Sequence, residues 1–210
     1  MQLLLFQLAD SAFPAGSFAH SLGFEALRGI GRLRGEHDLA LRLGELAWHT
    51  AYATLPFLGD AHRGDPHAAD RAVDRFLSSH VANRASRAQG RAFLIAAEAM
   101  LGADTGRVEL PYGHLPAAFG AVLAAAGVAL DDARELAMFG ALRSAVSAAV
   151  RLGVVGPLRA QRLLLEVGSI AERALAETRE LDGTHARTIS PLVELAQATH
   201  DRLYARLFQS

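Results

Sequence analysis

The chain has 210 residues, a net charge of −1, 51% hydrophobic residues and no cysteine. Its length suits one large domain or two small ones, and it is long enough to bury a self-sufficient core. The absence of cysteine excludes a disulfide scaffold, a thiol nucleophile and any cysteine-based zinc or iron–sulfur site. The balanced charge argues against a general nucleic-acid coat and against a disordered, self-repelling chain.

The composition favours helices. The sequence contains 42 alanines and 33 leucines, which are strong helix formers, and few of the residues that build sheets. All 21 basic residues are arginine, which we attribute to genomic base composition. Because lysine is absent, no lysine-dependent step such as a Schiff base or a Walker-A contact is available.

Apolar residues recur with helical spacing along almost the whole chain, whereas strand-like alternation bounded by turns is absent. We therefore predict an all-α, single-domain helical bundle of about eight to ten helices over residues 1–210. The predicted helices in chain order are 3–8, 18–27, one capped by Asp38, one or two within 55–79 divided at 64–66, 83–101, 115–126, 131–152, 157–178 with a bend at Gly168, and a last one that opens at Ser190 and carries its apolar stripe to Leu207.

Three segments are predicted to be loops. Residues 10–17 contain proline and glycine and break the first helix, and residues 102–113 have the composition of turns. Residues 181–188 are polar and expected to form a mobile loop.

No targeting or membrane segment is convincing. Residues 1–9 are apolar but lack a basic flank, and the uncharged stretch 110–130 is interrupted by prolines. We therefore expect a soluble cytoplasmic protein that does not bind a membrane.

Common catalytic signatures are missing. The sequence lacks the phosphate-binding P-loop, a dinucleotide-binding glycine motif after a strand, the nucleophile elbow of hydrolases and the HExxH motif of zinc proteases. None of the nine histidines has another histidine four residues away, so no helical metal-binding pair is present. We predict no tight metal site within one chain, and a site shared across a dimer axis stays open.

An arginine stripe marks the predicted helix 83–101. Arg84, Arg87 and Arg91 lie on one face of this helix, which is either a solvated face or a docking site for an acidic partner or a phosphate. On the opposite face, Ser86 and Gly90 form a pair of small residues that permits another helix to approach closely.

Arg143 is unusual because it lies between Phe139 and Val146 on a mainly apolar helix. An unpaired buried guanidinium is very costly, so Arg143 is expected to be paired or to lie at a subunit interface. Arg151 falls near the end of the same helix, where a cation suits the helix dipole.

The last residues of the chain are unusually apolar for a terminus. On a continuous helix, His200, Tyr204 and Phe208 line one face, next to a stripe that contains Leu203 and Leu207. This face either packs onto the protein's own core or is completed by a partner.

Three segments resemble one family, the urease accessory protein UreF. Residues 4–25 read LLFQLADSAFPAGSFAHSLGFE, similar to the family's N-terminal signature, and residues 114–120 read HLPAAFG, similar to its H-x-P-x-x-F-G motif. Residues 200–210 read HDRLYARLFQS and are similar to the usual ending of the family. Residues 146–152 and 161–164 also match, so the resemblance covers the chain end to end.

The resemblance implies a non-enzymatic, all-helical maturation factor that forms homodimers. Such proteins bind UreD, also called UreH, and recruit the GTPase UreG, and the complex acts on the urease apoprotein to install its nickel centre. The resemblance also suggests gating of nickel transfer or modulation of GTP hydrolysis. It implies no tightly bound cofactor, since nickel is in transit and GTP is bound by UreG.

Carried onto this sequence, the resemblance places partner contacts in four groups. The first group shapes an N-terminal surface and consists of Phe13, Pro14, Gly16, Phe18, His20, Ser21, Gly23 and Glu25. The second group helps to set a central helix pair or the dimer surface and consists of His114, Pro116, Phe119 and Gly120, and the third group meets partners or the dimer axis and consists of Arg143 and Arg151. The fourth group lies in a docking segment, residues 190–210, that binds UreD and orders on binding, and it consists of His200, Tyr204, Leu207 and Phe208.

Two other functions stay open. A helical metalloenzyme would use histidine and carboxylate side chains from separate helices, and it predicts a cleft that joins, for example, His20 and His114. A regulator would contact nucleic acid through the arginine stripe, with salt-dependent binding. Neither explains the three ordered motifs, so we expect no nucleic-acid partner.

Overall fold

The computed structural model describes residues 2–14, 19–203 and 206–209, and the regular secondary structure of these residues is helical. Two single turns of 3-10 helix in this part of the chain are η2 (Gly183–His185) and η3 (His200–Arg202). The α-helices are α1 (Gln2–Ala9), α2 (Phe24–Gly29), α3 (Glu36–Ala53), α4 (Leu55–Arg63), α5 (Pro66–Phe76), α6 (His80–Leu101), α7 (Ala103–Gly106), α8 (Leu115–Ala125), α9 (Leu130–Arg151), α10 (Pro157–Glu166), α11 (Gly168–Glu177) and α12 (Pro191–Ala198).

The all-α prediction is confirmed. Within the described ranges, ten α-helices have eight or more residues, which matches the predicted eight to ten, and α2 and α7 are shorter. Local signals place several boundaries correctly. The side chain of Asp65 accepts a hydrogen bond from the N–H of Ala68 at the start of α5, and the predicted bend at Gly168 separates α10 from α11.

The second helix begins later than predicted, at Phe24 instead of residue 18. Leu22 and Gly23 have φ values of 54° and 84°, which is the left-handed region, and a right-handed helix cannot pass through them. Residues 19–23 therefore form a turn before α2. Phe18 lies outside the described residues.

The prediction of one continuous helix from Ser190 to Leu207 is wrong. Helix α12 ends at Ala198, and the hydroxyl of Thr199 donates to the carbonyls of Leu195 and Ala196, both at 3.0 Å. Such a bond competes with continuation of the backbone ladder. One 3-10 turn follows, and Leu203 is already extended.

Three smaller differences concern loops. Helix α3 begins at Glu36, so Asp38 lies in its first turn and accepts a hydrogen bond from the N–H of Arg34 at 2.8 Å instead of capping the helix. The loop 102–113 contains the single turn α7. The loop 181–188 is held on α4, where Asp60 accepts the N–H of Gly183 at 2.8 Å.

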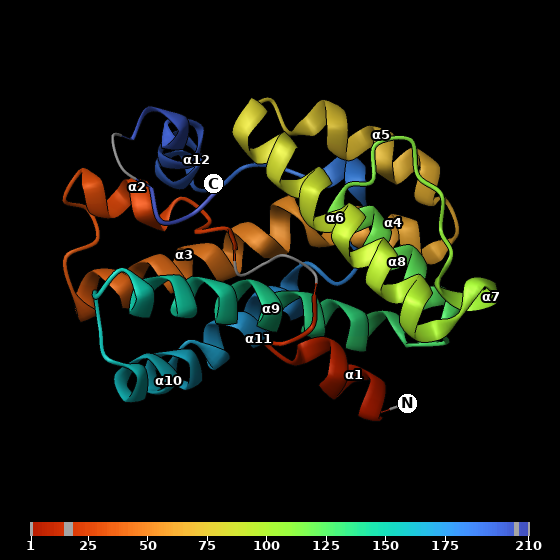
Figure 1. Ribbon diagram of the computed structural model, residues 1–210, viewed down its shortest axis with the longest axis horizontal. Helices are drawn as coiled ribbons and strands as arrows, with labels where there is room; N and C mark the ends of the chain where they lie inside the picture. Colours follow the sequence, from red (N-terminus) through yellow and green to blue (C-terminus); the bar gives the residue numbers. More distant parts are fainter. Residues whose placement is uncertain (1, 15–18, 204–205, 210) are drawn as a thin grey trace.

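Two long helices, α3 and α9, pack against each other across the middle of the molecule (Figure 1). At one end, α8 packs against α4, α5 and α6, and at the other end α12 packs on α2, close to the C-terminus. Helix α1 lies against α9. One cluster of buried apolar side chains extends from Leu8 of α1 to Phe208 of the C-terminal segment, so both chain ends contribute to the core.

Two glycines permit very close helix contacts. A Cβ on Gly120 of α8 would lie 2.3 Å from the carbonyl oxygen of Leu58 in α4, and a Cβ on Gly90 of α6 would lie 2.1 Å from that of Gly113. The predicted close approach at Ser86 and Gly90 is therefore confirmed, although the partner is the segment that leads into α8.

None of the helices in the described part of the chain is long and apolar enough to span a bilayer.

Candidate functional site

Glu25 lies in the first turn of α2, and its side chain is buried. One carboxylate oxygen, Oε1, accepts a hydrogen bond from the backbone N–H of Leu207 at 2.6 Å. The other, Oε2, accepts from the N–H of Phe208 at 3.3 Å and from Nε2 of His200 at 2.8 Å. A buried carboxylate is stable only when donors such as these replace its water. Glu25 therefore joins the N-terminal turn to the last residues of the chain.

Phe208 and Arg151 complete this cluster. The ring of Phe208 is buried, and the guanidinium carbon of Arg151 lies 4.1 Å from the ring centre, which is a cation–π distance. Arg151 also donates from Nη2 to the carbonyl oxygen of Leu207 at 3.4 Å. We call Glu25, Arg151, His200, Leu207 and Phe208 the tail site.

The N-terminal turn lies against the tail site and α12. His20 and Ser21 are buried, and a Cβ on Gly23 would lie 3.1 Å from the carbonyl oxygen of Val193 in α12. Burial, together with the nearby side chains of His200 and Arg84, lowers the pKa of His20 from 6.5 to about 4. His20 is therefore neutral at pH 7. Gly16 and Tyr204, which were predicted to contribute to the same surfaces, lie outside the described residues.

We expect the protein to lose stability as the pH falls from 6.5 to about 4, because His20 binds a proton in the unfolded chain over this range but stays neutral in the folded protein. The unfolded state binds more protons here, so the free energy of unfolding decreases with falling pH, by up to about 3 kcal/mol for His20. Burial also lowers the pKa values of His49 and His114, which adds to the loss in the same direction.

Urea unfolding at about pH 7.5 and about pH 5 measures this effect. The difference between the two pH values should be smaller in His20→Gln than in the wild type. A variant with the same pH dependence as the wild type would show that His20 does not carry the effect.

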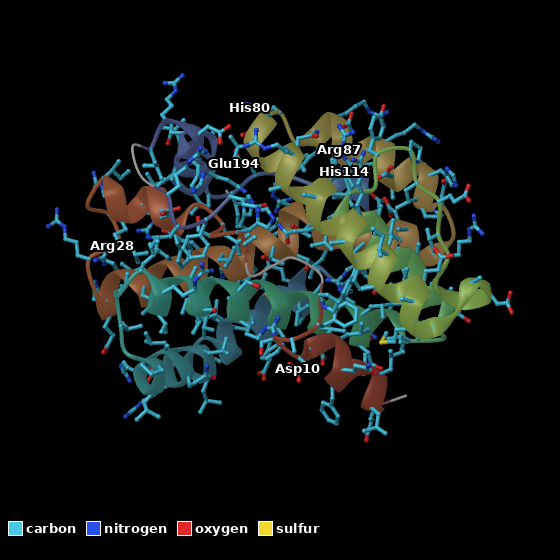
Figure 2. The ribbon with its side chains drawn as sticks, viewed as in Figure 1. Asp10, Arg28, His80, Arg87, His114 and Glu194 are labelled. Carbon is cyan, nitrogen blue, oxygen red and sulfur yellow. The ribbon has the colours of Figure 1, made fainter. Side chains whose placement is uncertain are left out.

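The arginine stripe on α6 contacts other parts of the same molecule. Both carboxylate oxygens of Asp201 in η3 accept from Nη2 of Arg84 at 2.9 Å, and this contact is the main reason that the pKa of Asp201 is lowered. The guanidinium carbon of Arg87 lies 5.6 Å from the ring centre of Tyr112. Arg87 of α6 lies close to His114, and His80 is the first residue of the same helix (Figure 2). Two members of the stripe therefore hold other segments of the protein.

A second cluster lies where the chain enters α8. Asp70 of α5 is fully buried, and its carboxylate accepts three successive backbone N–H groups, from Tyr112 at 2.7 Å, Gly113 at 3.2 Å and His114 at 2.8 Å. A carboxylate that accepts several N–H groups can stay charged in a buried place. Asp70 thereby fixes the backbone immediately before α8.

The His114 side chain is also fully buried. Its Nδ1 lies 3.1 Å from the hydroxyl oxygen of Ser86, and its Nε2 lies 3.1 Å from Oδ1 of Asp74. Burial lowers the pKa of His114, although the hydrogen bond with Asp74 acts in the opposite direction. Both ring nitrogens are therefore used within the protein, and the sequence signal at His114 corresponds to a packing network.

The remaining residues of this motif pack helices together. Pro116 is buried in the first turn of α8, and the ring of Phe119 lies 4.9 Å from that of Phe93 in α6, centre to centre. The ring of Phe13 also lies near Phe93, at 6.0 Å between the ring centres. Pro14 is exposed beside it.

The sequence predicts that Arg143 is either paired or at a subunit interface, and in the structure it is paired within the chain. Its Nη1 donates to the carbonyl oxygen of Ala9 at 2.6 Å, at the last residue of α1. A cation at the C-terminal end of a helix interacts favourably with the helix dipole, so this contact fastens α1 to α9.

A largely apolar cavity of about 260 Å³ lies between these clusters, lined by parts of α1, α3, α6, α8 and α9. His20, His49 and Ser86 line this cavity, and His114 is not among its lining residues. Among the described residues, no group of three or more histidine and carboxylate side chains is arranged to hold a metal ion.

Sequence reasoning missed two buried charged residues. Asp70 lies on the same buried face of α5 as Val73. A charged residue at a position of an apolar stripe is a signal that could have identified Asp70 as buried. Arg134 of α9 is almost fully buried and donates to the carbonyl oxygens of Leu175 at 3.2 Å and Arg179 at 3.1 Å, which caps the C-terminal end of α11. No local pattern distinguishes Arg134 from the exposed arginines around it.

The fold and these clusters define an all-helical protein in which buried carboxylates, histidines and arginines hold the ends and loops of one chain together. The chain belongs to the UreF family, since the family model described as UreF matches residues 34–168. It is 31% identical to urease accessory protein F of Arabidopsis thaliana, over 100% of this chain and 93% of that protein. It is also 31% identical to urease accessory protein UreF of Paenarthrobacter aurescens, over 100% of this chain and 98% of that protein.

Proposed function

We propose that this protein is a cytoplasmic, non-enzymatic adaptor for urease maturation that works as a homodimer. It bridges UreD (UreH) and the GTPase UreG for GTP-dependent nickel insertion into apo-urease. It binds no cofactor tightly, because nickel passes through the complex and GTP belongs to UreG. Control of nickel transfer or of GTP hydrolysis is part of the same role. Residues 1–210 act as one domain, with 190–210 as the docking segment.

The observation that carries this proposal is the full-length similarity to proteins named urease accessory proteins. The relatives from Arabidopsis thaliana and Paenarthrobacter aurescens are matched over the whole of this chain. Urease accessory protein F of rice, Oryza sativa subsp. indica, is 30% identical over 96% of this chain. Similarity that includes both chain ends supports a shared role of the complete chain, including the tail site.

The geometry of the tail site supports a docking role. The backbone of Leu207 is held by Glu25, but its side chain is 63% exposed, and the side chain of Leu195 in α12 is 69% exposed. Exposed leucines on a fixed backbone are suited to bind an apolar patch of another protein.

Urease activation in a host that carries the cognate urease genes tests the function. With the gene for this chain deleted, we expect urease protein to accumulate without nickel and without activity. Restoring the gene should restore both the nickel content and the activity. Full nickel content and activity in the deletion strain would contradict the proposal.

A matched pair of leucine variants tests the docking segment. Leu207→Ser should weaken binding of UreD at least about tenfold, because an apolar anchor at an interface core is lost. Leu165→Ser changes an 82% exposed leucine on α10 and is the control, with unchanged binding expected. Affinity measured by titration with purified UreD decides the matter, and equal affinities for both variants would exclude Leu207 from the docking surface.

A further inference from the structure

We propose that residues 28–34 are a docking site for an acidic segment of another protein that also carries an apolar side chain. These residues form the end of α2 and the turn before α3, and we call them the basic turn. Their guanidinium groups pair with carboxylates of the partner, and Ile30 packs on its apolar side chain. The proposal goes beyond the proposed function and does not depend on it.

The basic turn concentrates positive charge around one exposed apolar side chain. Arg28, Arg32 and Arg34 are exposed, and the side chain of Ile30 between them is 60% exposed. The ion pairs formed within the described part of the chain involve other arginines, so no carboxylate there neutralises these three. Arg28 lies at the edge of the molecule (Figure 2). Guanidinium groups in this position can bind the carboxylates of another chain.

The backbone of the basic turn is already fixed in the isolated chain. The N–H of Gly31 donates to the carbonyl oxygen of Arg28 at 3.0 Å, and the N–H of Arg32 donates to that of Leu27 at 2.8 Å. This pair of bonds is the Schellman motif, and Gly31 has the positive φ of 70° that the motif needs. Leu33 is buried and holds the turn against the core. A fixed backbone reduces the entropy that binding must offset.

The two acidic residues that follow the basic turn are engaged elsewhere. Asp38 accepts a hydrogen bond from the backbone N–H of Arg34 at 2.8 Å, not from its guanidinium group. Glu36 forms an ion pair with Arg159 of α10, with 2.5 Å between the oxygen and the nitrogen. The guanidinium group of Arg34 instead donates from Nε to the carbonyl oxygen of Gly31 at 2.7 Å. The positive charge of the basic turn is therefore left for a partner.

Two features favour an acidic protein segment over a phosphate or a nucleic acid. Phosphate sites commonly use backbone N–H groups that have no partner in the protein, whereas the N–H groups of Ile30, Gly31 and Arg32 all donate within the turn. An exposed isoleucine gains nothing from a phosphate backbone, but it can bury apolar surface against a protein side chain. An apolar centre with a charged rim is the usual arrangement of a protein interface.

Binding of a synthetic peptide to the isolated chain tests the proposal. The probe is a short fluorescent peptide of glutamate and aspartate with a leucine pair at its centre, and a second peptide has serines in place of the leucines. Fluorescence anisotropy should show that the leucine peptide binds and that its affinity falls with added salt, because exposed charge pairs are screened. The leucine peptide should bind at least about fivefold more tightly than the serine peptide.

Matched arginine variants separate the basic turn from the charge of the whole protein. Arg28→Gln/Arg32→Gln should weaken binding of the leucine peptide at least about tenfold at low salt, because two charge pairs are lost. Arg71→Gln/Arg75→Gln removes the same charge from exposed positions of α5 and is the control. This control should change the affinity by less than about twofold.

A matched pair of isoleucine variants tests the apolar part of the site. Ile30→Ser should weaken binding of the leucine peptide at least about fivefold and leave binding of the serine peptide unchanged. Ile95→Ser changes a 72% exposed isoleucine of α6 and should leave both affinities unchanged. All of these side chains are exposed, and circular dichroism establishes that the variants keep their helices.

Three results would overturn the proposal. The first is a wild-type protein that does not bind the leucine peptide at about 1 mM. The second is an equal loss of affinity in the α5 control and in the arginine variant of the basic turn. The third is a short DNA duplex that binds the basic turn more tightly than the leucine peptide does. The peptide test needs no urease protein, so its failure is distinguishable from failure of urease activation in the test of the proposed function.

Discussion

Gly120→Ala should lower the free energy of unfolding by about 3 kcal/mol or more, because the added methyl group collides with the backbone of a neighbouring helix. A Cβ at this position lies 2.3 Å from the carbonyl oxygen of Leu58 and 3.1 Å from the backbone nitrogen of His62. Backbone atoms cannot move aside as the end of a flexible side chain can, so α8 and α4 must separate. Urea unfolding followed by circular dichroism gives the magnitude.

Gly140→Ala is the matched control for this prediction. Gly140 lies within α9, and nothing lies within 4 Å of a Cβ built there. Alanine should therefore stabilise the protein by about 0.5–1 kcal/mol through its higher helix propensity. Opposite signs for two glycine-to-alanine changes within helices identify steric contact as the cause. Equal effects of the two variants would exclude it.

Asp70→Ala should be as damaging, with an expected loss of about 3–5 kcal/mol. The change removes the acceptor for the N–H groups of Tyr112, Gly113 and His114, and the bonds from Gly113 and His114 are buried. Asp70→Asn keeps one acceptor oxygen and should lose less. Asp104→Ala, at an exposed position of α7, should change the stability by no more than about 0.5 kcal/mol.

Hydrogen exchange separates the local effect of Asp70→Ala from global unfolding. The amides of residues 112–114 should lose protection before the rest of α8 does, because they lose their acceptor directly. If these amides keep their protection in a folded Asp70→Ala protein, the carboxylate does not anchor the segment.

Most helices could be predicted because their causes are local. Apolar periodicity marks α3 and α9, Pro66 and Pro157 stand in the first turns of α5 and α10, and the bend at Gly168 follows from a glycine inside a helical pattern. The wrong start of the second helix has a distant cause, whereas the early end of α12 goes with a local bond from the hydroxyl of Thr199. The turn at Leu22 and Gly23 lies against α12, and Gly23 leaves room for the carbonyl oxygen of Val193.

The candidate site could be predicted in part. The sequence motifs singled out Glu25, His114 and His200, and each of them is buried in a polar cluster. Their partners could not be foreseen, because Glu25 and Leu207 are 182 residues apart in the chain. A helical reading of the chain end assigned Phe208 to a helix face, whereas its amide bonds to Glu25 across the molecule.

By itself, the sequence determined the all-helical class, nearly all of the helix positions and the membership of the UreF family, because periodicity, prolines and ordered motifs are properties of neighbouring residues. Only the tertiary structure decided what the buried polar residues do. A buried charge must find donors or acceptors wherever the fold supplies them, and for Asp70, Glu25 and Arg134 these are backbone groups of segments far away in the chain. Backbone groups are the same at every residue, so no side-chain pattern in the sequence predicts which backbone groups a buried charge will contact.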